Sequence, residues 1–239
     1  MEKELTLVGT SHIARQSVEN VQKAIGEKSP DIVGVELDIY RYRGLLMEEG
    51  RKKTTPRIAD VRRIGVKGFL FALIGSLGMK KLAKYVGTNP GADMLEAIRV
   101  AHQNNIKVAL IDQNINTTLS SFSKKLSKKE IGRFFVDFFR GLFNPKGELK
   151  RLGVEKFDLS KVPSEKLVEN MIRHMKKRYP NVYDVLVHKR NVYMAKKIMK
   201  IMGQEQVNSM VCVVGAGHKQ GLKEILENQT SAGFSINLM

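Results

Sequence analysis

Short apolar runs alternate with longer amphipathic stretches along this chain, the pattern of a buried sheet covered by helices. Five apolar runs have the length and the bounding residues of strands. They are Leu5–Val8, Asp31–Asp38, Val108–Ile111, Met210–Val214 and Phe234–Leu238. Apolar residues recur at helical spacing behind the first and fourth runs and ahead of the third. This alternation predicts an α/β fold with a mostly parallel central sheet, flanking helices and an edge strand in the last run.

The middle of the chain has a different pattern, because from about residue 122 to residue 203 it shows helical spacing and no strand signal. Apolar side chains recur there at helical intervals, as in Ile131, Phe134 and Phe138. A chain of 239 residues can bury one substantial core. We therefore expect a single domain over residues 1–239, with a helical insertion at about 122–203 that lies over the carboxyl edge of the strands.

Two apolar segments allow more than one reading. Gly68–Met79 lies between basic residues and is shorter than the roughly 20 residues that span a bilayer. It fits a core helix or an interfacial helix held on acidic lipid. Phe134–Phe143 carries aromatic residues over more than one helix face. It fits packing on two sides, a lid, membrane contact or a homo-oligomer contact with a second copy.

Composition adds a strong positive charge to this picture. The chain has 41 Lys and Arg against 24 Asp and Glu, a formal net charge of +17. Such a field favours anionic partners, among them an acidic membrane surface or an acidic peptide. Nucleic acid is disfavoured because the basic clusters lack interleaved aromatic residues. The single cysteine, Cys212, and the absence of a signal-peptide pattern at the start predict a cytoplasmic protein, with a peripheral membrane location left open.

Two copies of a Gly-x-x-His motif are the first candidate chemistry. Gly9–His12 and Gly215–His218 each follow an apolar run and precede an amphipathic stretch. In a parallel sheet such turns meet at the carboxyl edge, and a helix N-terminus favours a neutral imidazole that can bind metal or accept a proton. Glycine at positions 9, 215 and 217 lets the backbone approach a ligand closely. We therefore expect His12 and His218 to share one pocket.

Carboxylates and arginines are expected at the same edge. Glu36 and Asp38 end the second apolar run and Asp112 ends the third, while Arg41 and Arg190 follow in amphipathic stretches. Singly, each has a structural reading, such as a helix cap or a salt bridge. Together at several strand ends, they are more simply explained as one functional site.

The order of these motifs resembles the TraB/PrgY/Tiki family over essentially the whole chain. Six motifs carry the resemblance: Gly9–His12, Val35–Asp38 with Arg41, Pro90–Met94, Ile111–Asp112, Asn191–Ala195 and Val214–Gly221. The resemblance implies a fold shared with erythromycin-esterase-like and ChaN-like proteins. Animal Tiki members are divalent-metal-dependent proteases, and bacterial TraB and PrgY members act in pheromone shutdown. Many relatives also carry a C-terminal membrane-spanning region. This sequence has none after Met239, so we expect either a naturally short member of the family or a soluble domain of a longer protein.

The resemblance assigns roles, and three mechanisms stay open. In the first, His12, His218 and Glu36 bind a divalent ion of the Mn²⁺ or Co²⁺ type and the chain is a metal-dependent peptidase. Asp38 and Asp112 would then hold a histidine in place, and Arg41 or Arg190 would bind substrate or an oxyanion. In the second, one histidine acts as a general base without metal, as in an esterase-like hydrolase.

The third mechanism is a regulatory protein that binds a peptide or an anion at a membrane surface without turnover. Gln113 and Lys189 favour it, and they are two of three departures from the family pattern. Gln113 and Lys189 stand where relatives have Arg and Glu, and Asp93 stands where glutamate is commoner.

Overall fold

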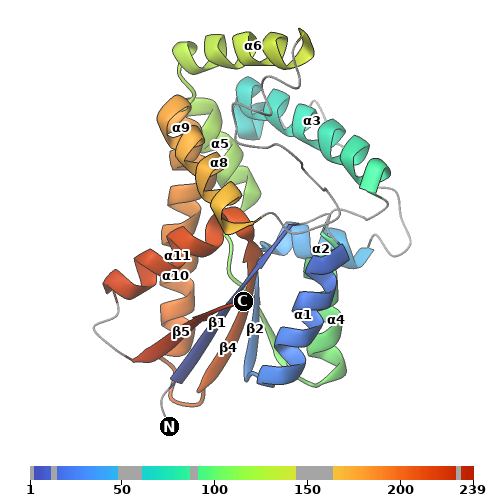
Figure 1. The fold of residues 1–239 in the computed structure, drawn as a ribbon, viewed down its shortest axis with the longest axis vertical. Helices are drawn as coiled ribbons and strands as arrows, with labels where there is room; N and C mark the ends of the chain where they lie inside the picture. The colour runs from blue at the N-terminus through green and yellow to red at the C-terminus, as the bar shows by residue number, and fades with distance from the viewer. Residues whose placement is uncertain (1–2, 12–14, 48–60, 87–90, 144–163, 230–232) are drawn as a thin grey trace.

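The computed structural model describes residues 3–11, 15–47, 61–86, 91–143, 164–229 and 233–239 (Figure 1). Within these ranges, five strands form one parallel sheet in the order β3-β2-β4-β1-β5. The strands are β1 (Lys3–Thr10), β2 (Ile32–Val35), β3 (Lys107–Leu110), β4 (Ser209–Gly215) and β5 (Phe234–Leu238). The predicted α/β fold with a parallel sheet is confirmed, and β5 is one of the two edge strands.

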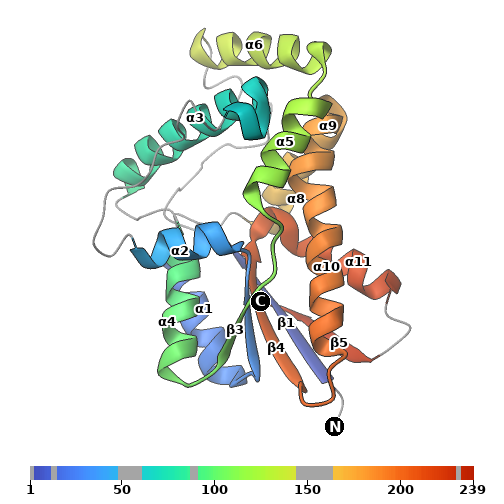
Figure 2. The ribbon, with the colours of Figure 1, turned by 180° about the vertical axis from the view of Figure 1, so that it is seen from behind.

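Helices cover both faces of this sheet (Figures 1 and 2). On one face lie α1 (Arg15–Lys28) and α4 (Ala92–Gln103), and on the other α10 (Lys189–Met202) and α11 (Ala216–Gln229). The other elements are α2 (Ile39–Met47), α3 (Val61–Val86), α5 (Ile115–Lys125), α6 (Lys128–Phe143), α8 (Glu165–Arg178), α9 (Pro180–Tyr183) and the π-helical turn η2 (Asp184–His188).

The central strand β4 shows why these runs are apolar without alternation. Val211 and Val213 pack into the core on the α1 and α4 side, whereas Met210, Cys212 and Val214 pack on the α10 and α11 side. Successive strand side chains point to opposite faces, and both faces are covered here. Burial also raises the pKa of the Cys212 thiol, so this cysteine is a packing residue.

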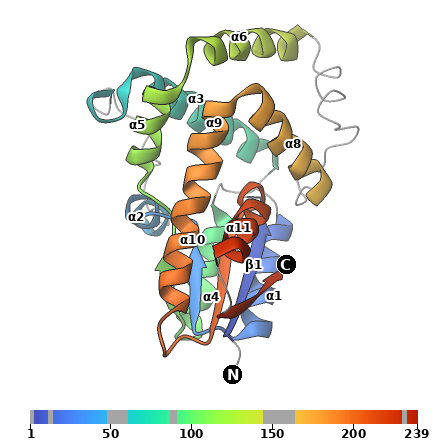
Figure 3. The ribbon, with the colours of Figure 1, turned by 90° about the vertical axis from the view of Figure 1, so that its left-hand side faces the viewer.

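A group of helices rises beyond the carboxyl edge of the strands, with α6 at its far end (Figures 1 and 3). There α3 packs tightly on α5, since a Cβ at Gly68 would lie 2.5 Å from the Leu119 carbonyl oxygen. Gly65, with φ at 75°, lets α3 bend beside the same helix. Within the described ranges, no helix combines the length and the apolar character needed to cross a bilayer.

Candidate functional site

The strand ends bring several candidate residues to one edge of the sheet. Glu36 follows β2 directly, Asp112 lies two residues past β3, and His218 lies in the first turn of α11 after β4. All three side chains are buried, as is that of Asp38. His12, which follows β1, lies outside the described residues. The expected meeting of the two histidines therefore stays a prediction. The structure does bring His218 together with the carboxylates of Glu36, Asp38 and Asp112.

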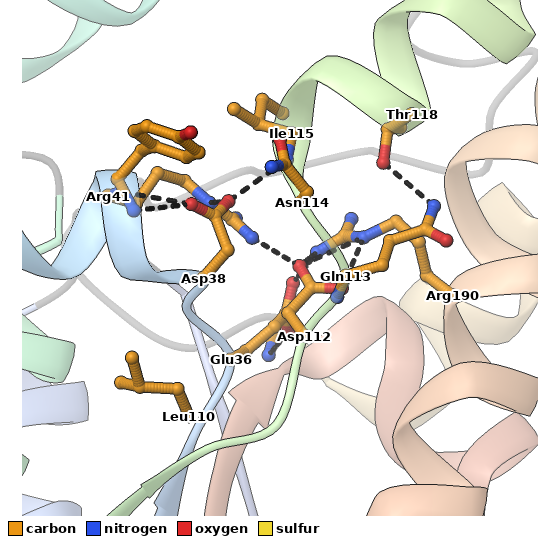
Figure 4. A network of polar contacts seen from close by, with 12 residues as sticks. Glu36, Asp38, Arg41, Leu110, Asp112, Gln113, Asn114, Ile115, Thr118 and Arg190 are labelled. Carbon is orange, nitrogen blue, oxygen red and sulfur yellow. Dashed lines mark hydrogen bonds and ion pairs between the residues drawn. The ribbon is translucent and has the colours of Figure 1, made fainter.

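Arg190 joins these strand ends from α10 (Figure 4). Its Nη2 atom donates to Glu36 Oε1 and, over 2.6 Å, to Asp112 Oδ2. Its Nε atom lies 3.2 Å from both Asp112 oxygens, and Nη1 lies 3.0 Å from His218 Nε2. One guanidinium thus links the ends of β2 and β3 with α11. Nη1 also donates to the carbonyl of Leu186, in the π-helical turn directly before α10. This contact holds the arginine side chain at the start of its helix.

Arg190 keeps its positive charge although most of its side chain is buried. Only 15% of its side chain is exposed. Burial opposes the charged form, but the charges of Glu36 and Asp112 outweigh this effect and raise the pKa of Arg190 above its ordinary value. The guanidinium therefore stays positive and compensates the buried carboxylates.

Glu36 also ties two strands together. Its Oε2 atom accepts a hydrogen bond of 2.6 Å from the backbone N–H of Gly215, at the end of β4. Both carboxylate oxygens are therefore engaged, one by a cation and one by the backbone. The glycine of the second Gly-x-x-His motif takes part in the site through its main chain.

Asp38 and Arg41 form a second ion pair beside the first (Figure 4). Asp38 Oδ1 accepts from the backbone N–H of Tyr40 and of Arg41, so it caps the start of α2. Its Oδ2 atom accepts from Arg41 Nε at 2.8 Å and from the Ile115 N–H at 3.0 Å. Arg41 Nη2 lies 2.5 Å from Asp112 Oδ2, so two arginines share this one oxygen.

The tautomer of His218 follows from two of its contacts. Nδ1 lies 2.6 Å from Asn191 Oδ1, an amide oxygen that can only accept, so Nδ1 carries the hydrogen. Nε2 then accepts from Arg190 Nη1. The ring is neutral in this arrangement, and Nε2 lies 3.4 Å from Glu36 Oε1.

Asn191 is a site residue that the sequence reasoning missed as a functional group. It is buried, with 2% of its surface exposed. A Cβ at Gly221 would lie only 2.6 Å from Asn191 Nδ2, so glycine lets α11 approach α10 closely enough for the histidine contact. The sequence signal that could have revealed this role is the position of Asn191 directly after Arg190, at the start of the Asn191–Ala195 motif.

The remaining candidate residues make less extensive contacts than those described above. At Gly9 a Cβ would lie 2.9 Å from Lys219 Cδ, the middle of a flexible side chain, and at Gly217 the nearest atom would be 3.5 Å away. Gln113 Nε2 donates to Thr118 Oγ1, and Lys189 Nζ lies 3.9 Å from Asp184 Oδ2. Within the described part of the chain, three or more His, Cys, Asp or Glu side chains are nowhere grouped as a metal site.

Comparisons with known proteins agree with the motif order. The model of the TraB/PrgY/gumN family matches residues 2–238. The uncharacterized protein MJ1365 of Methanocaldococcus jannaschii is 32% identical over 243 residues, which is 100% of this chain and 57% of that protein. The TraB domain-containing proteins of Bos taurus and Homo sapiens are 25% and 24% identical over 91% of this chain and 61% of their own length. The chain thus spans about three fifths of these relatives.

Proposed function

This chain belongs to the TraB/PrgY/gumN family, and from that premise we propose that it is a hydrolase that cleaves an amide or ester bond in a peptide substrate. The observation that carries the proposal is the pair formed by His218 and Glu36. A neutral, buried imidazole whose tautomer is set by Asn191 lies 3.4 Å from a carboxylate at the ligand-binding edge of a parallel sheet. This is the geometry of a general base and the group that stabilises its protonated form.

His218 acts through Nε2, which in the absence of substrate accepts an N–H from Arg190 Nη1. A substrate carbonyl oxygen that takes over this N–H releases Nε2 to accept a proton from water. The hydroxide then attacks the carbonyl carbon, and the proton passes from Nε2 to the leaving amine or alcohol as the bond breaks. Glu36 Oε1, next to Nε2, stabilises the imidazolium between these steps.

Arg190 stabilises the oxyanion in this scheme. Its guanidinium is held in place by Asp112 and Glu36 before substrate arrives, so little reorganisation accompanies the reaction. Arg41 is the more accessible of the two arginines, with 30% of its side chain exposed against 15%. We assign it to a substrate carboxylate that approaches Nη1, because Nε and Nη2 already donate to Asp38 and Asp112.

A divalent ion fits part of this donor set. His218 and Glu36 would hold it together with His12, which lies outside the described residues. The two atoms that would hold it, Nε2 of His218 and Oε1 of Glu36, lie 3.4 Å apart, close enough to bind one ion. Such an ion would supply a Lewis acid and an acidified water. The observation that favours the metal-independent scheme is that Arg190 already donates to both atoms.

A peptide library tests the proposal under three conditions: with EDTA, with added Mn²⁺ and with added Co²⁺. We expect cleavage that is lost in His218→Ala and Glu36→Gln and retained in His102→Ala, a control at an exposed position on α4. Cleavage that survives EDTA supports the metal-independent scheme, and cleavage that requires added metal supports the metal-dependent peptidase. Binding of library peptides without turnover in any condition would overturn the hydrolase and favour a regulatory peptide-binding protein.

A further inference from the structure

Arg41 keeps one donor group that its neighbours do not use. Its Nε atom donates to Asp38 Oδ2 at 2.8 Å and its Nη2 atom to Asp112 Oδ2 at 2.5 Å. Among the described residues, nothing accepts from Nη1. The Arg41 side chain is 30% exposed, whereas those of Asp38 and Asp112 are 4% and 0% exposed. The buried carboxylates therefore hold one edge of the guanidinium, and Nη1 on the other edge is left for a ligand.

The position of Nη1 is fixed before any ligand binds. Asp38 caps the start of α2 with one oxygen and accepts from the Ile115 N–H with the other, so the carboxylate that holds Arg41 Nε is itself held by the backbone. A planar guanidinium that is held at two of its three nitrogens has its third nitrogen in a set place. A donor that is placed in advance binds a carboxylate at a lower entropic cost than a mobile side chain does.

Arg41 and Arg190 are close neighbours in the site (Figure 4). Their Nη2 atoms donate to the same oxygen of Asp112, at 2.5 and 2.6 Å, so these two nitrogens lie no more than about 5 Å apart. Each Nη1 atom belongs to the same rigid group as its Nη2 atom. A peptide that contacts both Nη1 atoms therefore bridges a short stretch, roughly three residues or fewer at 3.3–3.6 Å per residue.

From this spacing we propose that the protein cleaves peptides within about three residues of a carboxylate that Arg41 binds. The inference rests on the proposed function, in which Arg190 holds the carbonyl of the bond that is cleaved. Water adds across that amide bond, its hydroxide to the carbonyl carbon and its proton to the leaving amine, so no further reactant is needed. A free C-terminus and the side chain of Asp or Glu supply the same carboxylate chemistry. The net charge of +17 favours the approach of such acidic peptides.

Three N-acetylated forms of one cleaved library peptide test this proposal on the native protein. All acidic side chains of the peptide are replaced, and the first form ends in a free carboxylate whereas the second ends in an amide. The third form is the amide with a single glutamate next to its last residue. A charge-assisted hydrogen bond should give the first form a kcat/KM about 10–100-fold above that of the second. Mass spectrometry of the products should place the cut within about three residues of the carboxylate.

The third peptide form separates the two sources of the carboxylate. A kcat/KM close to that of the first form means that Arg41 accepts an acidic side chain as well as a C-terminus. A kcat/KM close to that of the second form assigns the site to a free C-terminus, and the protein then releases short C-terminal fragments. Either result supports the proposal when the first form is preferred over the second.

Arg41→Gln removes the donor and keeps a polar side chain beside Asp38 and Asp112. The ratio of the kcat/KM values for acid and amide should fall close to one, mainly through a higher KM for the acid, because a contact made equally in the ground and transition states is lost. Arg43→Gln makes the same change in net charge at an exposed position on α2 and should keep the preference. Circular dichroism checks the fold of both variants. The comparison of the peptide forms needs no variant, so it tests the proposal even if Arg41→Gln does not fold.

The outcomes distinguish this inference from the hydrolase proposal on which it rests. Three results would overturn the inference alone: equal kcat/KM for the acid and the amide, a cut farther along the peptide from the carboxylate, or the full preference in folded Arg41→Gln. In each of these cases the native protein still cleaves peptides, so the hydrolase proposal stands. No cleavage of any library peptide would overturn both.

Discussion

Replacing Arg190 by methionine removes the cation that compensates two buried carboxylates. Arg190 Nη2 donates to Glu36 and Asp112, Nε lies 3.2 Å from both oxygens of Asp112, and Nη1 contacts His218. Methionine occupies similar space but supplies none of these hydrogen bonds. Glu36 keeps the N–H of Gly215 and Asp112 keeps Arg41, so each carboxylate is left only partly satisfied.

The expected cost follows from burial. Breaking a buried ion pair by removing one partner costs about 3–5 kcal/mol, because the other charge stays buried without full compensation. In a domain of this size each kcal/mol lowers the melting temperature by about 2–4 °C, so Arg190→Met should lower it by about 6–20 °C. Adding Asp112→Asn to Arg190→Met removes one of the carboxylate charges that are left without full compensation. The double variant should therefore lose less free energy of unfolding than the two single variants lose together.

Urea unfolding followed by far-UV circular dichroism measures this free energy. Arg173→Met, at an exposed position on α8, is the matched control and should change the free energy of unfolding by less than about 0.5 kcal/mol. A loss for Arg190→Met no larger than that of the control would refute the reasoning. It would mean that the carboxylates do not depend on Arg190 for their compensation.

Three further outcomes are expected. Asn191→Ala should lower kcat for peptide cleavage by about 10–100-fold with little change in KM, and ¹⁵N NMR of the His218 ring should show loss of the single tautomer. Gly221→Ala forces a Cβ to within 2.6 Å of Asn191 Nδ2 and should destabilise the fold by about 1–3 kcal/mol in urea unfolding; an unchanged midpoint would contradict the close helix contact. Burial opposes the charge of Glu130, but hydrogen bonds from Asn181 and Ser127 outweigh it and lower its pKa below the ordinary value of a glutamate side chain. Its contribution is therefore complete above that value and lost as pH falls through the folded-state pKa, so hydrogen exchange of α6 should rise on acidification in the native protein and not in Glu130→Gln.

Much of the fold could be predicted from the sequence because the central strands β1, β2 and β4 are buried on both faces. A continuous apolar run such as Met210–Val214, followed by carboxylates or glycine, is most simply explained as a buried parallel strand. The gathering of Glu36, Asp112 and His218 followed from the same rule, since parallel strands end at one edge. These predictions needed only local pattern and topology.

The partners within the site could not be predicted in this way. Arg190 lies 154 residues from Glu36 in sequence, and no spacing rule says which of the two arginines meets which carboxylate. Asp38 or Asp112 was expected to support a histidine, which stays a prediction because His12 lies outside the described residues. The described contacts of the Asp38 oxygens are with the start of α2, Arg41 and the backbone of Ile115, and no spacing rule indicates them. Asn191 carries no charge and no motif chemistry of its own, so only its contact with His218 reveals a role.

The attachment of α6 shows a second limit of pattern reasoning. A helix rich in aromatic residues is normally expected to bury them, and its period says nothing about which face meets the protein. Tertiary contacts decide that question for the described residues, because Asp137 of α6 pairs with Arg178 and Glu130 accepts hydrogen bonds from Asn181. Such long-range charge pairing depends on tertiary structure.

The central claim is that Glu36 and His218 form a hydrolytic centre, and the most direct measurement is the rate of peptide cleavage by Glu36→Gln beside the native protein and His102→Gln. The substitution keeps the shape of the side chain and can keep the hydrogen bond from Gly215, so circular dichroism should be unchanged. We predict a rate at least about 100-fold lower for Glu36→Gln, with His102→Gln at the native rate. A native rate in Glu36→Gln, or no cleavage by the native protein with and without added metal, would contradict the account.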